Sequence, residues 1–196
     1  ALADTQISHD DNFDVTLTAT SAAATAITAI DAATTKVVDA NLVTTLTGTA
    51  AAIAAAAQLD ADGTTTLKAD FGATVDEGAV NASDLNTISG RTTATIDATA
   101  ATAINGTATA VTTALADTQI NHDDNFTVTL TNNSTATALE LIAINAATTQ
   151  PVTATGVTTI TGSISDVNTV LAAESNQDQA GDAIDLDADF AVTITD

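Results

Sequence analysis

The chain has 196 residues, of which 25 are acidic and three are basic, so that its formal net charge at pH 7 is −22. A charge of this sign and size repels phosphate backbones and anionic lipid headgroups, which argues against nucleic acids and membrane surfaces as partners. The lack of cysteine excludes disulfides, thiol catalysis and thiolate metal sites. The sequence contains no run of about 18 apolar residues and therefore predicts no membrane-spanning segment.

Seven segments are predicted to be β-strands because apolar and polar residues alternate along them. In the first, Phe13, Val15 and Leu17 fall on one face while Asp14 and Thr16 fall on the other, which is the pattern of a half-buried strand. In chain order the segments are 10–18, 39–47, 68–76, 97–105, 123–131, 153–161 and 187–195.

Alanine-rich stretches between these strands carry apolar residues three or four positions apart, as at Ala23, Ile27 and Ile30, and predict helices of two to three turns. A serine or threonine suited to capping a helix N-terminus precedes five of them, and three strands reach this residue through a glycine, which predicts a tight corner. The expected caps are Ser21, Thr49, Thr107, Ser134 and Ser163.

The chain repeats itself at two scales. Residues 1–18 return almost unchanged at 114–131. A shorter repeat is seen in the apolar residues that close the first four predicted strands, which are Leu17, Leu46, Val75 and Ile104. The spacing of these anchors is constant at about 29 residues, and a fixed period of this length is typical of stacked supersecondary units. The sequence therefore predicts an α/β repeat solenoid of about seven parallel strand–short helix rungs, roughly 29 residues each, forming a leucine-rich-repeat-like ribbon with one continuous sheet. A tandem of separate β-sandwich domains is the alternative, and it requires strands without alanine-rich helices.

The size of the inward residue alternates along the predicted strands, which indicates a unit of two rungs. A phenylalanine ring is wider than one rung and can spread over a smaller neighbour, so we expect a true repeat of about 57 residues. The alternating row is Phe13, Leu42, Phe71, Ala100, Phe126, Gly156 and Phe190. We expect one array over residues 1–196, with paired-rung units near 1–59, 60–115 and 116–175 and a partial unit at 176–196.

Two rows of equivalent positions, about 4.8 Å apart from strand to strand, carry candidate chemistry. The first is a hydroxyl row on the open face: Thr16, Thr45, Thr74, Thr129, Thr159 and Thr193. The second is acidic: Asp10, Asp39, Asp97, Asp123 and Asp187. Adjacent carboxylates repel, and calcium, a hard cation that prefers oxygen ligands, would relieve the repulsion. A solvated acidic face without metal is the alternative explanation.

The two histidines, His9 and His122, occupy identical contexts beside aspartates and could indicate a metal or acid–base site. The sequence favours a solvated strand entry that was copied by duplication, because the other predicted rungs have no histidine.

Two stretches, LNTISGRTTATIDATAATAINGTATAV at 85–111 and NAATTQPVTATGVTTITGSISDVNTVLAAE at 145–174, resemble the tandem repeats of giant cell-surface proteins of marine cyanobacteria. That group includes the very large surface protein needed for non-flagellar swimming. The resemblance implies an extracellular structural array, and it supplies no catalytic residues.

We therefore expect a structural segment of an extracellular filament, sheath or surface layer, and no enzyme. Its partner would be another copy joined head to tail, or the continuation of the same array, with the strand at 7–17 pairing with a strand equivalent to 184–194. An adhesin that binds carbohydrate or mineral through its Thr/Asn/Asp face is the alternative. Exposed aromatic side chains would favour the adhesin, whereas all four phenylalanines fall on the predicted inward row.

Overall fold

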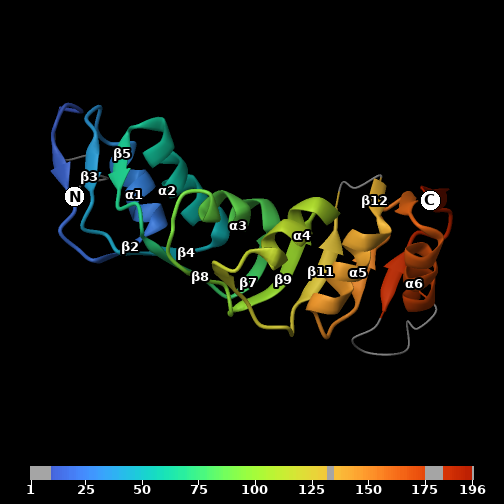
Figure 1. The fold of residues 1–196 in the computed structure, drawn as a ribbon. Helices are drawn as coiled ribbons and strands as arrows, with labels where there is room; N and C mark the ends of the chain where they lie inside the picture. Colours follow the sequence, from blue (N-terminus) through green and yellow to red (C-terminus); the bar gives the residue numbers. More distant parts are fainter. Residues whose placement is uncertain (1–9, 132–134, 175–182, 196) are drawn as a thin grey trace.

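The computed structural model describes residues 10–131, 135–174 and 183–195, and it has an α/β fold in which strands pair only in parallel. Within these residues six helices follow one another side by side along an elongated molecule, with α1 near one end and α6 near the other (Figure 1). The helices are α1 (Ala24–Asp31), α2 (Ala50–Asp62), α3 (Ala82–Ser89), α4 (Ala108–Ala116), α5 (Ala138–Ala147) and α6 (Ile164–Glu174).

The described strands form four sheets, which we name A to D in chain order. Sheet A contains β1 (Val15–Thr16), β3 (Val38–Ala40) and β5 (Thr65–Leu67). Sheet B contains β2 (Ser21–Ala23), β4 (Thr45–Gly48), β6 (Gly72–Val75), β8 (Ile96–Asp97) and β10 (Ile120–Asn121). Sheet C contains β7 (Gly78–Asn81), β9 (Ala101–Gly106), β11 (Thr127–Leu130), β13 (Val152–Ala154) and β15 (Ile184–Leu186). Sheet D contains β12 (Thr135–Thr137), β14 (Thr159–Gly162) and β16 (Ala191–Ile194).

The prediction of one continuous sheet is wrong, and so is the prediction that the apolar anchors form one row. Leu46 pairs with Ala73 in sheet B, whereas Ile104 lies in sheet C. The reason is that most strands pair at a shorter interval than the spacing of the anchors, as the pairs Ser21–Thr45 and Thr135–Thr159 show. Because the strands repeat at a shorter interval than the anchors, equivalent anchors fall in different sheets. Sheets B and C each end after five strands, and later strands form a new sheet.

The number of strands between consecutive helices alternates. Two strands separate α1 from α2, three separate α2 from α3, two separate α3 from α4, three separate α4 from α5, and two separate α5 from α6. Helices α1, α3 and α5 begin at Ala24, Ala82 and Ala138, at nearly equal intervals along the chain. The structural period of the described chain is thus two helices and five strands.

The helix starts follow capping chemistry in four of the six described cases. Thr49 and Thr107 accept a hydrogen bond from the backbone N–H three residues on, and Ser163 does the same for Asp166. Helix α1 begins after Ala23 without a side-chain cap, so the expected role of Ser21 is wrong. Helix α5 is capped by Thr137, whose hydroxyl and backbone form a capping box with Glu140, and the expected cap Ser134 lies outside the described residues.

The glycine corner before α6 shows how closely the chain turns from strand to helix. A Cβ atom at Gly162 would lie 3.0 Å from the Cβ of Ala138 at the start of α5. No larger residue fits this corner without displacing the neighbouring helix, which explains the glycine that the sequence places there.

A single apolar cluster runs between the helices and the sheets. Ile27, Leu85 and Ile144 contribute to it from the helices, and Leu46 and Val128 from the strands, and all five are fully buried. The predicted alternation holds in β11, where Val128 and Leu130 are buried and Thr127 and Thr129 are exposed, but not in β16, all four residues of which are exposed. Burial of this kind contributes about 25 cal/mol per Å² of apolar surface, so many small alanine contacts add to a few larger ones.

The predicted alternation of inward residues is half right. Phe71 and Phe126 are buried with 1% of their surface exposed. Leu42, Ala100 and Gly156 are instead exposed, because each lies at the tip of a tight turn. The turn at Leu42 is closed by a hydrogen bond from the Val43 N–H to the Ala40 oxygen, and the other two turns are closed in the same way. The residues that enter the core after these turns are Val43, Ala101 and Val157, one position later than expected.

Candidate functional site

The predicted row of threonine hydroxyls is divided among the sheets. Thr45 pairs with Ser21 and Gly72, and Thr74 pairs with Thr47 and Asp97. Each sheet nevertheless carries a ladder of its own. These polar ladders are Thr16–Asp39–Thr66 in sheet A, Ala23–Thr47–Thr74–Asp97–Asn121 in sheet B, Asn81–Asn105–Thr129–Thr153–Asp185 in sheet C, and Thr137–Thr161–Thr193 in sheet D.

The predicted acidic row is not a row of neighbours. Asp39 lies between Thr16 and Thr66, and Asp97 lies between Thr74 and Asn121. Neither carboxylate therefore faces another carboxylate across the strands.

The carboxylates of this set serve the local turns instead. Asp39, Asp97 and Asp187 each accept a hydrogen bond from the backbone N–H two residues on, at 2.9 to 3.2 Å. Such side chains fix a turn by imitating a backbone carbonyl. Asp10 and Asp123 lie before the same kind of corner, in exposed positions. In the part of the chain that the structure describes, no group of three or more His, Cys, Asp or Glu side chains comes together, and calcium binding stays a prediction.

His122 directly follows β10 and lies beside Ala98 of the neighbouring strand segment. In sheets A and C the corresponding alanines, Ala40 and Ala154, pair with Leu67 and Leu186. Its ring contacts the ring of Phe126 edge to face, with centroids 5.3 Å apart, and its Nδ1 lies 2.8 Å from the backbone oxygen of Asp123. The imidazole thus fills an apolar position at a corner, in keeping with a structural role. His9 lies outside the described residues.

A threonine contact that we did not expect from the sequence repeats once per structural period. The hydroxyl of Thr34 donates to the backbone oxygen of Phe13 at 2.6 Å, and the hydroxyl of Thr92 donates to that of Phe71 at 2.5 Å. Thr148 makes the same contact to Phe126.

Each of these hydroxyls also accepts a backbone N–H two residues on, at 3.0 to 3.1 Å. The adjacent threonine donates its backbone N–H to the preceding strand segment. The signal was present in the sequence as ATTK, RTTA and ATTQ, one in each structural period, but it is inconspicuous in a chain so rich in threonine.

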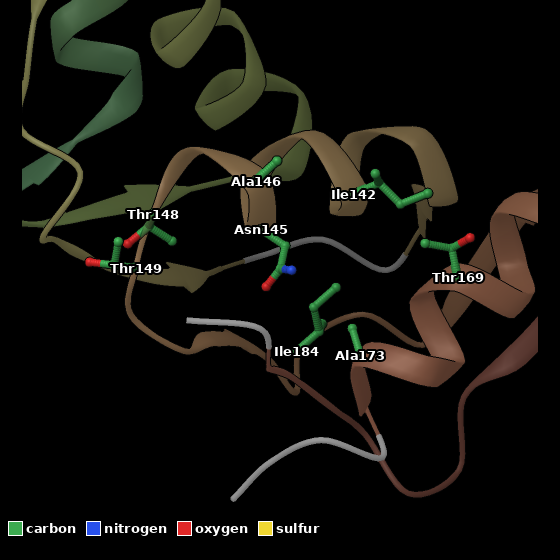
Figure 2. A pocket seen from close by; sticks show the side chains of 8 residues that line it. All are labelled: Ile142, Asn145, Ala146, Thr148, Thr149, Thr169, Ala173 and Ile184. Carbon is green, nitrogen blue, oxygen red and sulfur yellow. The ribbon is translucent and has the colours of Figure 1, made fainter. Parts of the chain in front are cut away.

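A hollow of about 440 Å³ lies against α5, α6 and β15 (Figure 2). Ile142, Asn145, Ala173 and Ile184 line it together with three threonines and Ala146. The hydroxyls of Thr148 and Thr169 are engaged with backbone oxygens. None of the described residues that line the hollow is ionisable.

Exposed apolar side chains lie at several places along the described residues: Leu139 is 63% exposed, and Leu42 and Ile164 are each 55% exposed. At the C-terminal end, Val192 and Ile194 of β16 are 41% and 45% exposed, although their partners in β14 include the fully buried Ile160. At the N-terminal end, Leu17, Ile27 and Ile30 line an open hollow of about 320 Å³ beside β1 and α1.

No protein-family model, curated protein or solved structure matches this chain. Among the described helices none is long and apolar enough to cross a membrane. The candidate site is therefore defined by geometry alone, as the pair of open end surfaces and the polar ladders between them.

Proposed function

We propose that this chain is a structural segment of an extracellular filament, sheath or surface layer. Its fold would be an α/β solenoid that acts as a stiff acidic spacer and that joins other copies head to tail. The observation that carries the proposal is the regular stacking of helix on helix and strand on strand from β1 to β16 in the described residues, where β1 and β16 are outer strands of their sheets.

Support comes from the physics of open arrays. A parallel strand edge offers unpaired N–H and C=O groups, and a head-to-tail contact between unlike ends does not close, so the product is a filament rather than a dimer. The dispersed carboxylates keep the sides of such a filament hydrated and apart from one another. The extracellular location rests on the resemblance to cyanobacterial surface repeats.

Sedimentation velocity over a hundredfold range of protein concentration tests the proposal. We expect a series of species whose mass rises with concentration in steps of 19.4 kDa. A single, non-associating species of 19.4 kDa at every concentration would contradict self-association. Labelling of intact cells with an antibody against the chain tests the location, and a signal that requires permeabilised cells would refute it.

A further inference from the structure

Among the described residues, the first and last sheets have three strands each, and the two sets of strands are complementary. Sheets B and C each have five strands, and the third strand of each, β6 and β11, directly follows a buried phenylalanine, Phe71 or Phe126. Strand β1 follows Phe13 and begins sheet A, while β16 follows Phe190 and ends sheet D. Sheet A therefore corresponds to the third, fourth and fifth strands of a complete sheet, and sheet D to the first, second and third.

We propose that β16 of one copy takes the place of β1 in the next copy, so that the junction is formed by strand replacement. This proposal rests on the head-to-tail association above and specifies its geometry. Sheet D of one copy, followed by β3 and β5 of the next, makes a complete sheet of five strands. Simple pairing of β16 with β1 would instead make a sheet of six, with two strands of the same kind side by side.

The sequences of the two strands are interchangeable. Residues 10–18 read DDNFDVTLT and residues 187–195 read DADFAVTIT, with the phenylalanine, the valine and both threonines at the same places. The incoming strand offers Val192 and Ile194 where the resident strand has Val15 and Leu17. Exchange of an identical element between copies is a low-cost route to association, because the lost contacts are replaced by equivalent ones.

Burial favours the replaced arrangement. Phe71 and Phe126, which have a strand on each side, are 1% exposed, whereas Phe13 and Phe190 are half-buried. Next to β3, Phe190 would gain the second neighbour that it lacks in this chain. Strand β1 has only two residues and pairs with β3. Its flanks also accept hydrogen bonds from Thr34 and Thr35, and these contacts would be exchanged for equivalent ones with the incoming strand.

The threonine contact supplies a specific anchor for the incoming strand. Thr34 donates its hydroxyl to the backbone oxygen of Phe13. In the junction, Thr34 of the next copy would donate to the Phe190 oxygen and so repeat the contacts of Thr92 and Thr148.

The order of elements also continues without interruption. Three strands separate an even-numbered helix from the next helix in this chain, as β5 to β7 do between α2 and α3. Across the junction, β15 and β16 of one copy and β2 of the next would supply three strands between α6 and the following α1. Helix α1 would then pack against α6 as α3 packs against α2.

Cysteine cross-linking distinguishes the two geometries, because the chain has no cysteine of its own. Thr16 pairs with Asp39, so replacement places Thr193 opposite Asp39 of the next copy, while simple pairing places Thr193 opposite Thr16. Paired Cα atoms of neighbouring strands lie about 4.8 Å apart, within the range that a disulfide spans. All three residues are exposed. Because Asp39→Cys removes the hydrogen bonds from Asn41, circular dichroism of each variant checks that the fold is kept.

We expect Thr193→Cys mixed with Asp39→Cys to give an intermolecular disulfide under mild oxidation, and Thr193→Cys mixed with Thr16→Cys to give none. The reverse result would overturn replacement and leave head-to-tail association standing. No cross-link in either mixture, together with a monomer in sedimentation, would overturn both. If the protein isolated from its source is one longer polypeptide in which β3 pairs with another strand of that same polypeptide, no second copy takes the place of β1 and the proposal is wrong.

Two matched substitutions give a second readout in solution. Phe190→Ala should weaken association about tenfold, which equals about 1.4 kcal/mol. Phe13→Ala should strengthen association by a similar factor, because it weakens the strand that is displaced. Weakening by both substitutions would contradict replacement and favour simple pairing.

Discussion

The threonine that anchors each phenylalanine strand gives the sharpest test of the internal fold. Thr92 is 6% exposed; its hydroxyl donates to the Phe71 oxygen at 2.5 Å and accepts the Ala94 N–H at 3.0 Å. Thr92→Val keeps the shape of the side chain and removes both contacts.

A buried polar group left without a partner costs about 1–3 kcal/mol. Since the Phe71 oxygen is buried and Ala94 is half-buried, we expect Thr92→Val to lower the free energy of unfolding by about 2–4 kcal/mol. Urea unfolding followed by circular dichroism measures this loss, and hydrogen exchange should show it as faster exchange of the Ala94 amide.

Thr93→Val is the matched control. Thr93 is exposed and binds Ala69 only through its backbone N–H, which the substitution keeps, so the free energy of unfolding should change by no more than about 0.5 kcal/mol. If Thr92→Val is no more destabilising than Thr93→Val, the hydroxyl contact does not hold the strands together and the reasoning fails.

Three further predictions follow from the burial and hydrogen bonds described above. Phe71→Ala should lower the free energy of unfolding, measured in urea, by about 3–5 kcal/mol, as for other buried rings. Ala100→Phe, at an exposed turn, should lower it by less than about 0.5 kcal/mol, and equal losses would contradict the placement of Phe71 inside the core and Ala100 outside it. Burial raises the pKa of Glu140, but hydrogen bonds from Thr109 and Thr137 outweigh it and hold this pKa below 4.5. The stabilisation by Glu140 is therefore present above pH 4.5 and lost as the pH falls through the lowered value, so Glu140→Gln should approach the stability of the parent chain only in acid. Calcium binding at the acidic residues predicts a larger rise in melting temperature with calcium than with sodium chloride at equal ionic strength. An equal rise would contradict the metal site and leave charge screening, in keeping with Asp39 and Asp97 facing threonine and asparagine rather than each other.

Local structure could be predicted from the sequence because it depends on neighbouring residues. The alternation in 123–131 predicts β11, and the Gly–Thr and Gly–Ser steps predict the starts of α2, α4 and α6. Parallel strands and alternating helices follow from the same patterns. These features need no knowledge of which strand lies beside which.

Strand register was beyond the sequence pattern because it depends on how many residues each corner consumes. Leu42 looks like an inward residue by alternation, yet the turn that precedes Val43 shifts the buried face by one position. The same shifts divide the threonine row among four sheets and place Asp39 and Asp97 in two different sheets. The role of Thr92 was missed because only its depth and its partner, Phe71, separate it from the exposed Thr93.

In the proposed filament, copies of this chain stack end to end with their strands across a common axis. Diffraction from aligned filaments of the purified chain tests this claim most directly. Stacked parallel strands should give a reflection near 4.8 Å along the filament axis, since about 4.8 Å is the spacing between neighbouring strands. A reflection at about 4.8 Å perpendicular to the axis, or a chain that forms no filaments at any concentration, would contradict the account.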